Sequence, residues 1–206
     1  AITDDGQYHA WTEINVPQRP FEIENVDTVT VPLAQSGYTT EYLRYRITIN
    51  DRPNETNYYR IVIDKQTTLW GYNHEEGGDD YIYWTKHSYN FIGREDVVLT
   101  DGQPTTGDDE DNGLFDTAKN IYGVFDDTRF RNTSYTMTVY NNTKIETGSD
   151  SGYFSGMDVI IRLMSITETE YYYLKALNLV DSDAYDETIN EPIKYPSNVH
   201  GGTGMV

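Results

Sequence analysis

The feature that most constrains the fold of this chain is a strict alternation of side chains between residues 43 and 49. The apolar and aromatic positions are Leu43, Tyr45, Ile47 and Ile49, and the polar positions between them are Arg44, Arg46 and Thr48. A period of two residues is that of a β-strand, whose successive side chains point to opposite faces. We therefore expect a half-buried strand with Tyr45, Ile47 and Ile49 in the core and the polar set at solvent or a polar interface. A slip by one residue would bury arginine side chains, at a cost of roughly several kcal/mol.

A second strand-like segment follows a short turn. Tyr59, Ile61 and Ile63 are spaced by two residues, and the Asp-Arg-Pro-Asn-Glu stretch at 51–55 favours a turn. Strand-like segments on either side of a turn are typical of an antiparallel hairpin. We therefore predict that the segments at 43–49 and 59–63 pair with each other.

Several other segments have the composition of strands. Residues 68–72 and 81–84 are aromatic and flank a polar loop at 73–80, and later strands are expected near Phe125, at 135–140 and at 159–164. Residues 21–31, between Pro20 and Pro32, are expected to form an extended linker strand. The predicted fold class is therefore all-β, mainly antiparallel and sandwich-like.

One helix stands out from this β-rich pattern. The sequence Thr-Glu-Thr-Glu at 167–170 is a capping box, in which the Thr167 hydroxyl accepts a hydrogen bond from the backbone N–H of Glu170. Tyr171, Leu174 and Leu177 then recur at helical spacing. We predict one principal helix near residues 168–178.

Composition restricts the classes of function. The 206 residues suit one large all-β domain, or one domain plus a fragment. Acidic residues number 34 against 15 basic ones, for a net charge of −19, which argues against binding nucleic-acid backbones and suits a hydrated or cation-binding surface. The absence of cysteine excludes disulfides, thiolate metal sites and cysteine nucleophiles. No apolar run approaches the roughly 20 residues of a membrane helix.

Three short motifs occur in a fixed order. The first is a strand ending at Asp51 with Asn-Tyr-Tyr at 57–59, the second is Phe-Asp-Asp-x-x-Phe at 125–130, and the third is the tail at 191–206, with Glu-Pro, Ser-Asn and a glycine-rich end. The tail suits a bend or a close backbone approach. In this order the motifs resemble a family of Bacteroidota outer-membrane lipoproteins catalogued as a domain of unknown function, family 4249. The resemblance spans nearly the whole chain.

The resemblance carries expectations about organisation and location. Family members begin with a signal peptide, a lipidated cysteine and an immunoglobulin-like region, which this chain lacks. Residues 1–17 are therefore expected to be the exit strand of a mostly missing N-terminal domain, with a strand at 8–16, and residues 18–206 a β-rich C-terminal domain. The resemblance also implies anchoring at the outer-membrane surface and a role beside a TonB-dependent transporter. The missing N-terminal region or another chain would then be a partner.

The aromatic segments around residues 70–84 are the strongest candidate for ligand binding. The candidate residues are Trp70, Tyr72, His74, Tyr81, Tyr83 and Trp84. Flat aromatic faces beside hydrogen-bonding groups suit a carbohydrate ring, a peptide or a protein hot spot. Alternation places Tyr81 and Tyr83 on one face and Trp84 on the other, so one of these sets is expected to be buried. His74 and His87 flank this hairpin and can meet across it.

The acidic segment at 101–116 resembles part of a calcium loop. Counting Gly113 as position six puts Asp108, Glu110 and Asn112 at positions one, three and five, and Asp116 at nine. Position twelve is Lys119, where an EF-hand requires glutamate, so an EF-hand is not expected. The leading interpretation is a solvated acidic loop without a cofactor, and a bound calcium ion is the alternative.

The sequence contains no recognisable catalytic constellation. Nucleophile elbows, phosphate loops and dinucleotide fingerprints are absent, and the four histidines are scattered. The leading hypothesis is a non-enzymatic cell-surface lipoprotein module that serves a TonB-dependent transporter by ligand capture or protein contact. The alternatives are a secreted carbohydrate-binding or carbohydrate-active protein, and an adhesive or structural subunit that assembles by strand exchange.

Overall fold

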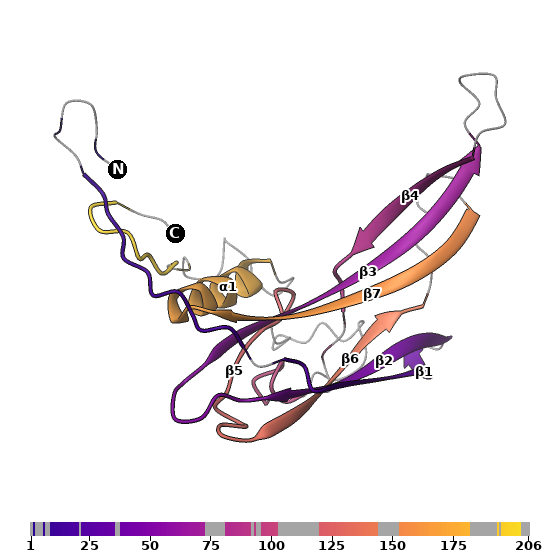
Figure 1. The fold of residues 1–206 in the computed structure, drawn as a ribbon, viewed down its shortest axis with the longest axis horizontal. Coiled ribbons are helices and arrows are strands. Elements are labelled where there is room, and N and C mark those ends of the chain that lie inside the picture. The colour runs from indigo at the N-terminus through magenta and orange to yellow at the C-terminus, as the bar shows by residue number, and fades with distance from the viewer. Residues whose placement is uncertain are drawn as a thin grey trace.

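The computed structural model describes residues 2, 6, 9–20, 22–35, 38–72, 81–91, 93, 96–102, 120–143, 153–181, 193 and 195–202. Within these ranges the elements are β1 (Asn25–Gln35), β2 (Tyr38–Asn50), β3 (Tyr58–Tyr72), β4 (Tyr81–Ser88), β5 (Val124–Asp126), β6 (Ser134–Asn142), β7 (Tyr153–Ile166) and α1 (Glu168–Val180) (Figure 1). Every strand pairing is antiparallel. The predicted all-β, sandwich-like class with one principal helix is confirmed.

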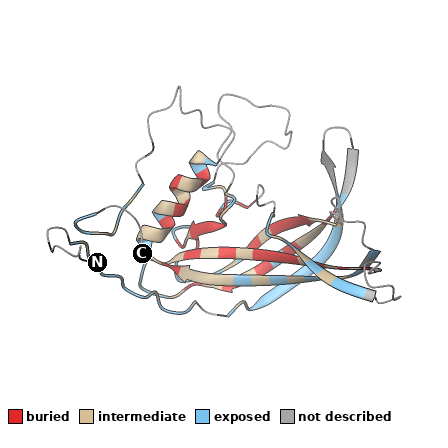
Figure 2. Ribbon diagram, turned by 90° about the horizontal axis from the view of Figure 1, so that it is seen from above, coloured by how far each residue is buried: buried red, intermediate tan, exposed pale blue. Residues whose placement is uncertain are grey.

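The strands form two sheets. One has the order β1–β2–β6. In the other, β7 runs along one edge of β3, while β5 and β4 share the opposite edge. Figure 1 shows the two sheets close together near β5 and diverging toward the far end of β3 and β4. In Figure 2 buried residues concentrate where α1 and the sheets overlap, and exposed residues become frequent toward the far end of the long strands.

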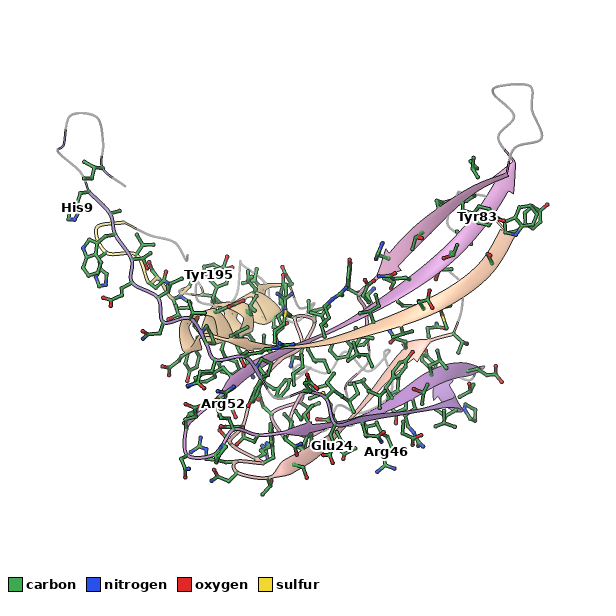
Figure 3. The ribbon with its side chains drawn as sticks, in the orientation of Figure 1. His9, Glu24, Arg46, Arg52, Tyr83 and Tyr195 are labelled. Atoms are coloured by element: carbon green, nitrogen blue, oxygen red, sulfur yellow. The ribbon has the colours of Figure 1, made fainter. Side chains whose placement is uncertain are left out.

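The main core lies between the two sheets. Tyr45, Ile47 and Ile49 of β2 pack there with residues of β3 that include Ile61 and Ile63, and all five are buried. The polar residues of β2 are outside the core: Arg46 is exposed, and Arg44 and Thr48 are intermediate. Figure 3 shows Arg46 pointing away from the body of the protein. The orientation predicted from the alternation is therefore confirmed.

The predicted pairing of 43–49 with 59–63 is wrong. β2 pairs with β1 and β6, whereas β3 belongs to the other sheet. The two strands face each other across the core instead of hydrogen bonding side by side. Alternation reports that one face of a strand is buried, and this is equally true of a hairpin partner and of a strand in the opposite layer.

The strand that pairs with β2 is β1, which overlaps the segment that we expected to form a linker strand. β1 pairs with β2 in continuous register from Asn25 opposite Thr48 to Gln35 opposite Tyr38. Val26 and Val29 are exposed, as is common at the edge of a sheet. The extended strand expected at 21–31 is therefore present in part, but its pairing with β2 was not predicted.

Helix α1 begins where the capping box predicts. Thr167 accepts a hydrogen bond from the backbone N–H of Glu170 at 3.1 Å. The helix continues two residues past the expected end at Asn178, whose buried amide oxygen accepts from the backbone N–H of Tyr122 at 3.2 Å. The apolar side of the helix packs on the second sheet through Tyr171 and Leu174. This contact fixes the helix at the β5 end of the sheet.

The two terminal segments hold each other. The backbone of Trp11 donates to His200 O at 3.0 Å and accepts from His200 N at 2.8 Å, and the two rings stack at 4.2 Å. Gly201 has φ +77°, and a Cβ there would lie 2.2 Å from the carbonyl oxygen of His9, so the tail makes the close backbone approach that its glycines predicted. The strand expected at 8–16 is not formed over residues 9–16, which are extended with isolated bridges at His9 and Trp11. We call this pairing the terminal clasp.

Candidate ligand-binding face

The second sheet has an inner and an outer face. Odd-numbered residues of β3, such as Tyr59 and Ile61, point into the core between the sheets, so its even-numbered residues lie on the opposite, outer face. Helix α1 covers this outer face at one end, where Tyr58 and Ile166 pack against Tyr171. The remaining part, from Val62 to the end of β3, is the region that we call the outer face below.

An aromatic row crosses the outer face near the end of the sheet. Trp70 on β3 lies directly opposite Tyr83 on β4 and Tyr153 on β7, and directly opposed residues share a face. The rings of Trp70 and Tyr153 stack with centroids 4.7 Å apart and planes 27° apart. Tyr83 is 65 % exposed and Tyr153 is 60 % exposed, while Trp70 is intermediate. Figure 3 places Tyr83 at the far end of the long sheet.

A β-bulge builds this row. The register between β3 and β7 shifts between Thr68 and Leu69, so that Gly156 is opposite Thr68 but Phe154 is opposite Leu69. Ser155 is the extra residue. Without it, Tyr153 would be opposite Gly71 and would point to the inner side. Bulges commonly re-aim side chains in this way.

The other predicted site residues separate into different environments. Trp84 is opposite Leu69, on the inner side, and a Cβ on Gly71 would lie 3.2 Å from its ring. Trp84 is therefore a packing residue, on the face opposite to Tyr83 as expected. Tyr72 and Tyr81 pair through their backbones at the end of the hairpin, and their side chains lie outside the described part. His74 and the acidic candidates Asp108, Glu110, Asn112 and Asp116 also lie outside the described residues.

A polar band lies between the aromatic row and helix α1. Its central feature is a contact between Asp64 on β3 and His87 on β4, whose Nδ1 is 2.9 Å from the Asp64 carboxylate. Gln66 donates to the same carboxylate at 2.8 Å, and Arg162 lies 3.6 Å from it. Asp64 is only 2 % exposed, whereas the His87 side chain is 43 % exposed. The carboxylate is thus covered by its partners while the imidazole reaches solvent.

The partners of Asp64 decide its charge. Burial by itself would raise the pKa of Asp64, but hydrogen bonds from Gln66 and His87 and the charges of His87 and Arg162 outweigh it and lower the pKa. Asp64 is therefore ionised near neutral pH. The sequence related His87 only to His74 across the hairpin and gave no indication of Asp64 or Tyr153. Asp64 lies within a strand that has no distinguishing motif, and Tyr153 precedes the strand that was expected at 159–164.

A groove at the opposite end of the sheet is a second candidate. It has a volume of about 380 Å³ and lies between the N-terminal segment 13–18, the loop at 55–58 and the start of α1. Its lining includes Glu13, Glu55 and Glu168, and all three carboxylates are exposed. The hydroxyl of Tyr58 donates to Glu168 at 3.0 Å. The groove has a polar, acidic wall, and its lining includes one aromatic residue, Tyr58, where the outer face has a row of three.

The motif residues at 51–59 and 125–130 meet in a buried network that we call the crossing-loop network. Asn57 donates from its backbone to Asp127 at 2.8 Å, and its amide donates to Asp51 at 3.4 Å. Asp51 also accepts from the hydroxyl of Tyr59 at 3.0 Å and the backbone of Asn132 at 2.8 Å. These residues tie the loop that crosses between the sheets to the turn before β6. Their role is to hold the fold.

No group of three or more histidine, aspartate or glutamate side chains in the described part is placed to hold a metal ion. No helix in that part is both long enough and apolar enough to cross a membrane.

The fold and the outer face together define an all-β protein of two stacked sheets that presents aromatic and polar side chains on one of them. The chain belongs to the family described as a domain of unknown function, DUF4249, whose profile matches residues 1–206. No curated protein and no solved structure gives a significant match.

Proposed function

We propose that this chain is a non-enzymatic module that captures a ligand on the outer face of its second sheet. The aromatic row of Tyr153, Trp70 and Tyr83 carries the proposal, because exposed aromatic side chains in register across several strands present a large apolar surface to solvent. Thr68 and Thr85 continue this surface with hydroxyl groups. Such a combination suits a ligand with both flat apolar faces and hydrogen-bonding groups, such as a carbohydrate or a peptide.

The placement of the buried carboxylates supports binding over acid–base chemistry. Asp51, Asp64 and Asp127 all accept hydrogen bonds from neighbouring protein groups. A carboxylate whose oxygens are already occupied by several protein donors is poorly placed to exchange a proton with a substrate. These residues therefore serve the fold or the orientation of their neighbours.

The proposal extends to location and partner through the motif resemblance. The proposed location is the outer-membrane surface, as part of an exported lipoprotein beside a TonB-dependent transporter. The acidic composition, with 34 acidic and 15 basic residues, suits a well-hydrated cell-surface protein. In this role the outer face would either concentrate a nutrient for the transporter or contact the transporter itself.

The test compares two groups of alanine variants. One carries Trp70→Ala, Tyr83→Ala and Tyr153→Ala together, and the control carries Tyr172→Ala, which removes an exposed tyrosine from α1. Affinity gel electrophoresis with soluble polysaccharides measures ligand capture, and pull-down from outer membranes of the native host measures recovery of a TonB-dependent receptor. We expect the triple variant to lose binding and the control to keep it. Equal behaviour of the two variants would contradict the proposal.

Assembly by strand exchange is the second candidate function. Among the described strands β7 pairs only with β3, so its other edge has no strand beside it over Tyr153–Ile166. Unpaired edges of this length can accept a strand from another chain. Light scattering after size exclusion at several protein concentrations tests this, because strand exchange predicts a concentration-dependent increase in mass.

A further inference from the structure

We infer that His87, held by Asp64, is the hydrogen-bonding residue with which the outer face selects a neutral oligosaccharide. The inference rests on the proposed function, because it assigns the ligand class of the same face. Asp64 acts through His87 and is therefore a positioning residue.

The contact between the two residues fixes which imidazole nitrogen is available. An ionised carboxylate only accepts hydrogen bonds, so the Nδ1 of His87, at 2.9 Å and 3.2 Å from the two carboxylate oxygens, must carry the proton. Gln66 on the same strand and Arg162 on β7 hold the carboxylate in place. In the neutral imidazole Nε2 is then a hydrogen-bond acceptor, and it has no hydrogen-bond partner within the described part of the chain. A histidine oriented in this way by a carboxylate is pre-organised for contact with a ligand.

The position of His87 sets the length of the ligand. It lies on the same strand and the same face as Tyr83, four residues away, which corresponds to about 13 Å along a β-strand. Thr85 is exposed between them, and Thr68 lies opposite Thr85. A ligand that touches both the aromatic row and His87 must therefore be extended. An oligosaccharide spans this distance, whereas a single sugar does not.

The charges on the face favour a neutral ligand. Carboxylates come from Asp64 on β3 and Asp158 on β7, and positive charge comes from Arg162 on β7. Tyr89 stacks beside His87 with ring centroids 6.2 Å apart. With charges of both signs close together, the face has no dominant field for a charged ligand. The remaining contacts are ring stacking and hydrogen bonds to hydroxyl groups, which match a neutral sugar.

Protonation of His87 changes the character of the contact. The neutral ring accepts a hydrogen bond from a ligand hydroxyl at Nε2, while the protonated ring can only donate one. The charged and titratable groups beside His87 on this face are Asp64, Asp158, Arg162 and Tyr89, and Asp64 stays ionised because its pKa is lowered. The contact with a ligand hydroxyl therefore requires the neutral form of the His87 ring.

The experiment uses isothermal titration calorimetry on the full chain. The probes are cellohexaose, maltohexaose, laminarihexaose and xylohexaose, with a tyrosine-rich hexapeptide as the competing ligand class. We expect at least one hexasaccharide to bind and Trp70→Ala to abolish that binding. His87→Ala should weaken it about tenfold, as the loss of one hydrogen bond predicts. His87→Gln, which retains an acceptor, should restore part of the affinity, and His9→Ala is the matched control on a distant histidine.

Asp64 is tested through a double-mutant cycle. Asp64→Asn should weaken binding as much as His87→Ala, and the double variant should bind no worse than either single variant. A purely structural role of Asp64 would instead give additive losses. Thermal melting of each variant shows whether the fold is retained.

The outcomes separate the inference from the proposed function. If His87→Ala binds the hexasaccharide as the wild type does while Trp70→Ala does not, the inference is overturned and the proposed function stands. If the peptide binds through the aromatic row and no hexasaccharide binds, the ligand class is overturned. If none of the probes binds, the inference is overturned, and the polysaccharide and membrane tests above decide the proposed function.

Discussion

The backbone N–H of Asn57 donates a hydrogen bond of 2.8 Å to the Asp127 carboxylate, although the two residues are separated by 70 positions in sequence. The amide of Asn57 also donates to the same carboxylate at 3.2 Å. Asp127 is fully buried and accepts a further hydrogen bond from Arg131 at 3.0 Å. One asparagine therefore links the loop between the two sheets to the turn that leads into β6. The crossing-loop network fixes how the sheets stack.

Removing the Asn57 side chain should destabilise the protein. Asn57→Ala leaves the Asp51 and Asp127 carboxylates with fewer donors in a buried setting, which costs about 1–3 kcal/mol. Urea unfolding followed by tryptophan fluorescence measures the change in the free energy of unfolding. The control is Asn25→Ala at the exposed start of β1, which should change it by less than about 0.5 kcal/mol. A similar result for the two variants would show that the network is not a major source of stability.

A pair of glycines gives a second stability test. Gly123 has φ +64°, and a Cβ there would lie 2.2 Å from the backbone oxygen of Ile61. Gly123→Ala should therefore destabilise the protein by about 2 kcal/mol or more, because it adds both backbone strain and a clash with backbone. Gly156→Ala is the matched control, since nothing lies within 4 Å of its Cβ position. Thermal melting of both variants is sufficient, and an equal effect would refute the assigned conformation at Gly123.

The sequence predicted individual elements better than their partners. The alternation in β2 and the capping box of α1 are local patterns that arise from the same physics wherever the element lies, and both are confirmed. The pairing of β2 depends on long-range contacts with β1 and β6, which alternation does not encode. A strand in an opposite layer and a hairpin partner have the same pattern of buried side chains.

Only part of the candidate site was predicted, because it also depends on strand pairing that local patterns do not encode. Trp70 and Tyr83 were identified because aromatic residues in neighbouring strands suggest a binding surface, and the structure places them on one face. Tyr153 was missed because the strand that carries it was expected only at 159–164, and the bulge at Ser155 sets the face to which it points. Asp64 and His87 are 23 positions apart, and only their pairing across β3 and β4 brings them together.

Tyr45 provides a prediction about pH. Its hydroxyl is buried without a hydrogen-bond partner among the described residues, and burial raises its pKa to about 12. In the unfolded chain the hydroxyl of Tyr45 ionises at about pH 10, so its contribution to stability is complete below that pH. It is lost as pH rises toward the folded pKa, by up to about 1.4 kcal/mol per pH unit.

Tyr45→Phe should remove this part of the alkaline loss. At pH 7 it should leave stability unchanged or raise it by about 1 kcal/mol, because an unpaired hydroxyl no longer has to be buried. Urea unfolding at pH 7 and at about pH 11 measures both effects. Strong destabilisation at pH 7 would mean that the hydroxyl has a partner that stabilises the core.

The terminal clasp leads to a final prediction, about a chain that begins at Pro17. The main core contains no residue of the segment 9–16, so this truncation should remain folded, with a melting temperature close to that of the full chain. The truncation should instead free the C-terminal tail, which loses two hydrogen bonds. In the full chain the backbone N–H of His200 donates to the backbone oxygen of Trp11 at 2.8 Å, and the hydroxyl of Thr12 donates to the backbone oxygen of Asn198 at 2.6 Å. Amide hydrogen exchange near residues 198–201 should become faster, while exchange in β2 and β3 should not change. Trp11→Ala, which removes the ring stacking but keeps the backbone bonds, should give a smaller increase. Unfolding of the truncated chain would show that the N-terminal segment stabilises the two-sheet body itself.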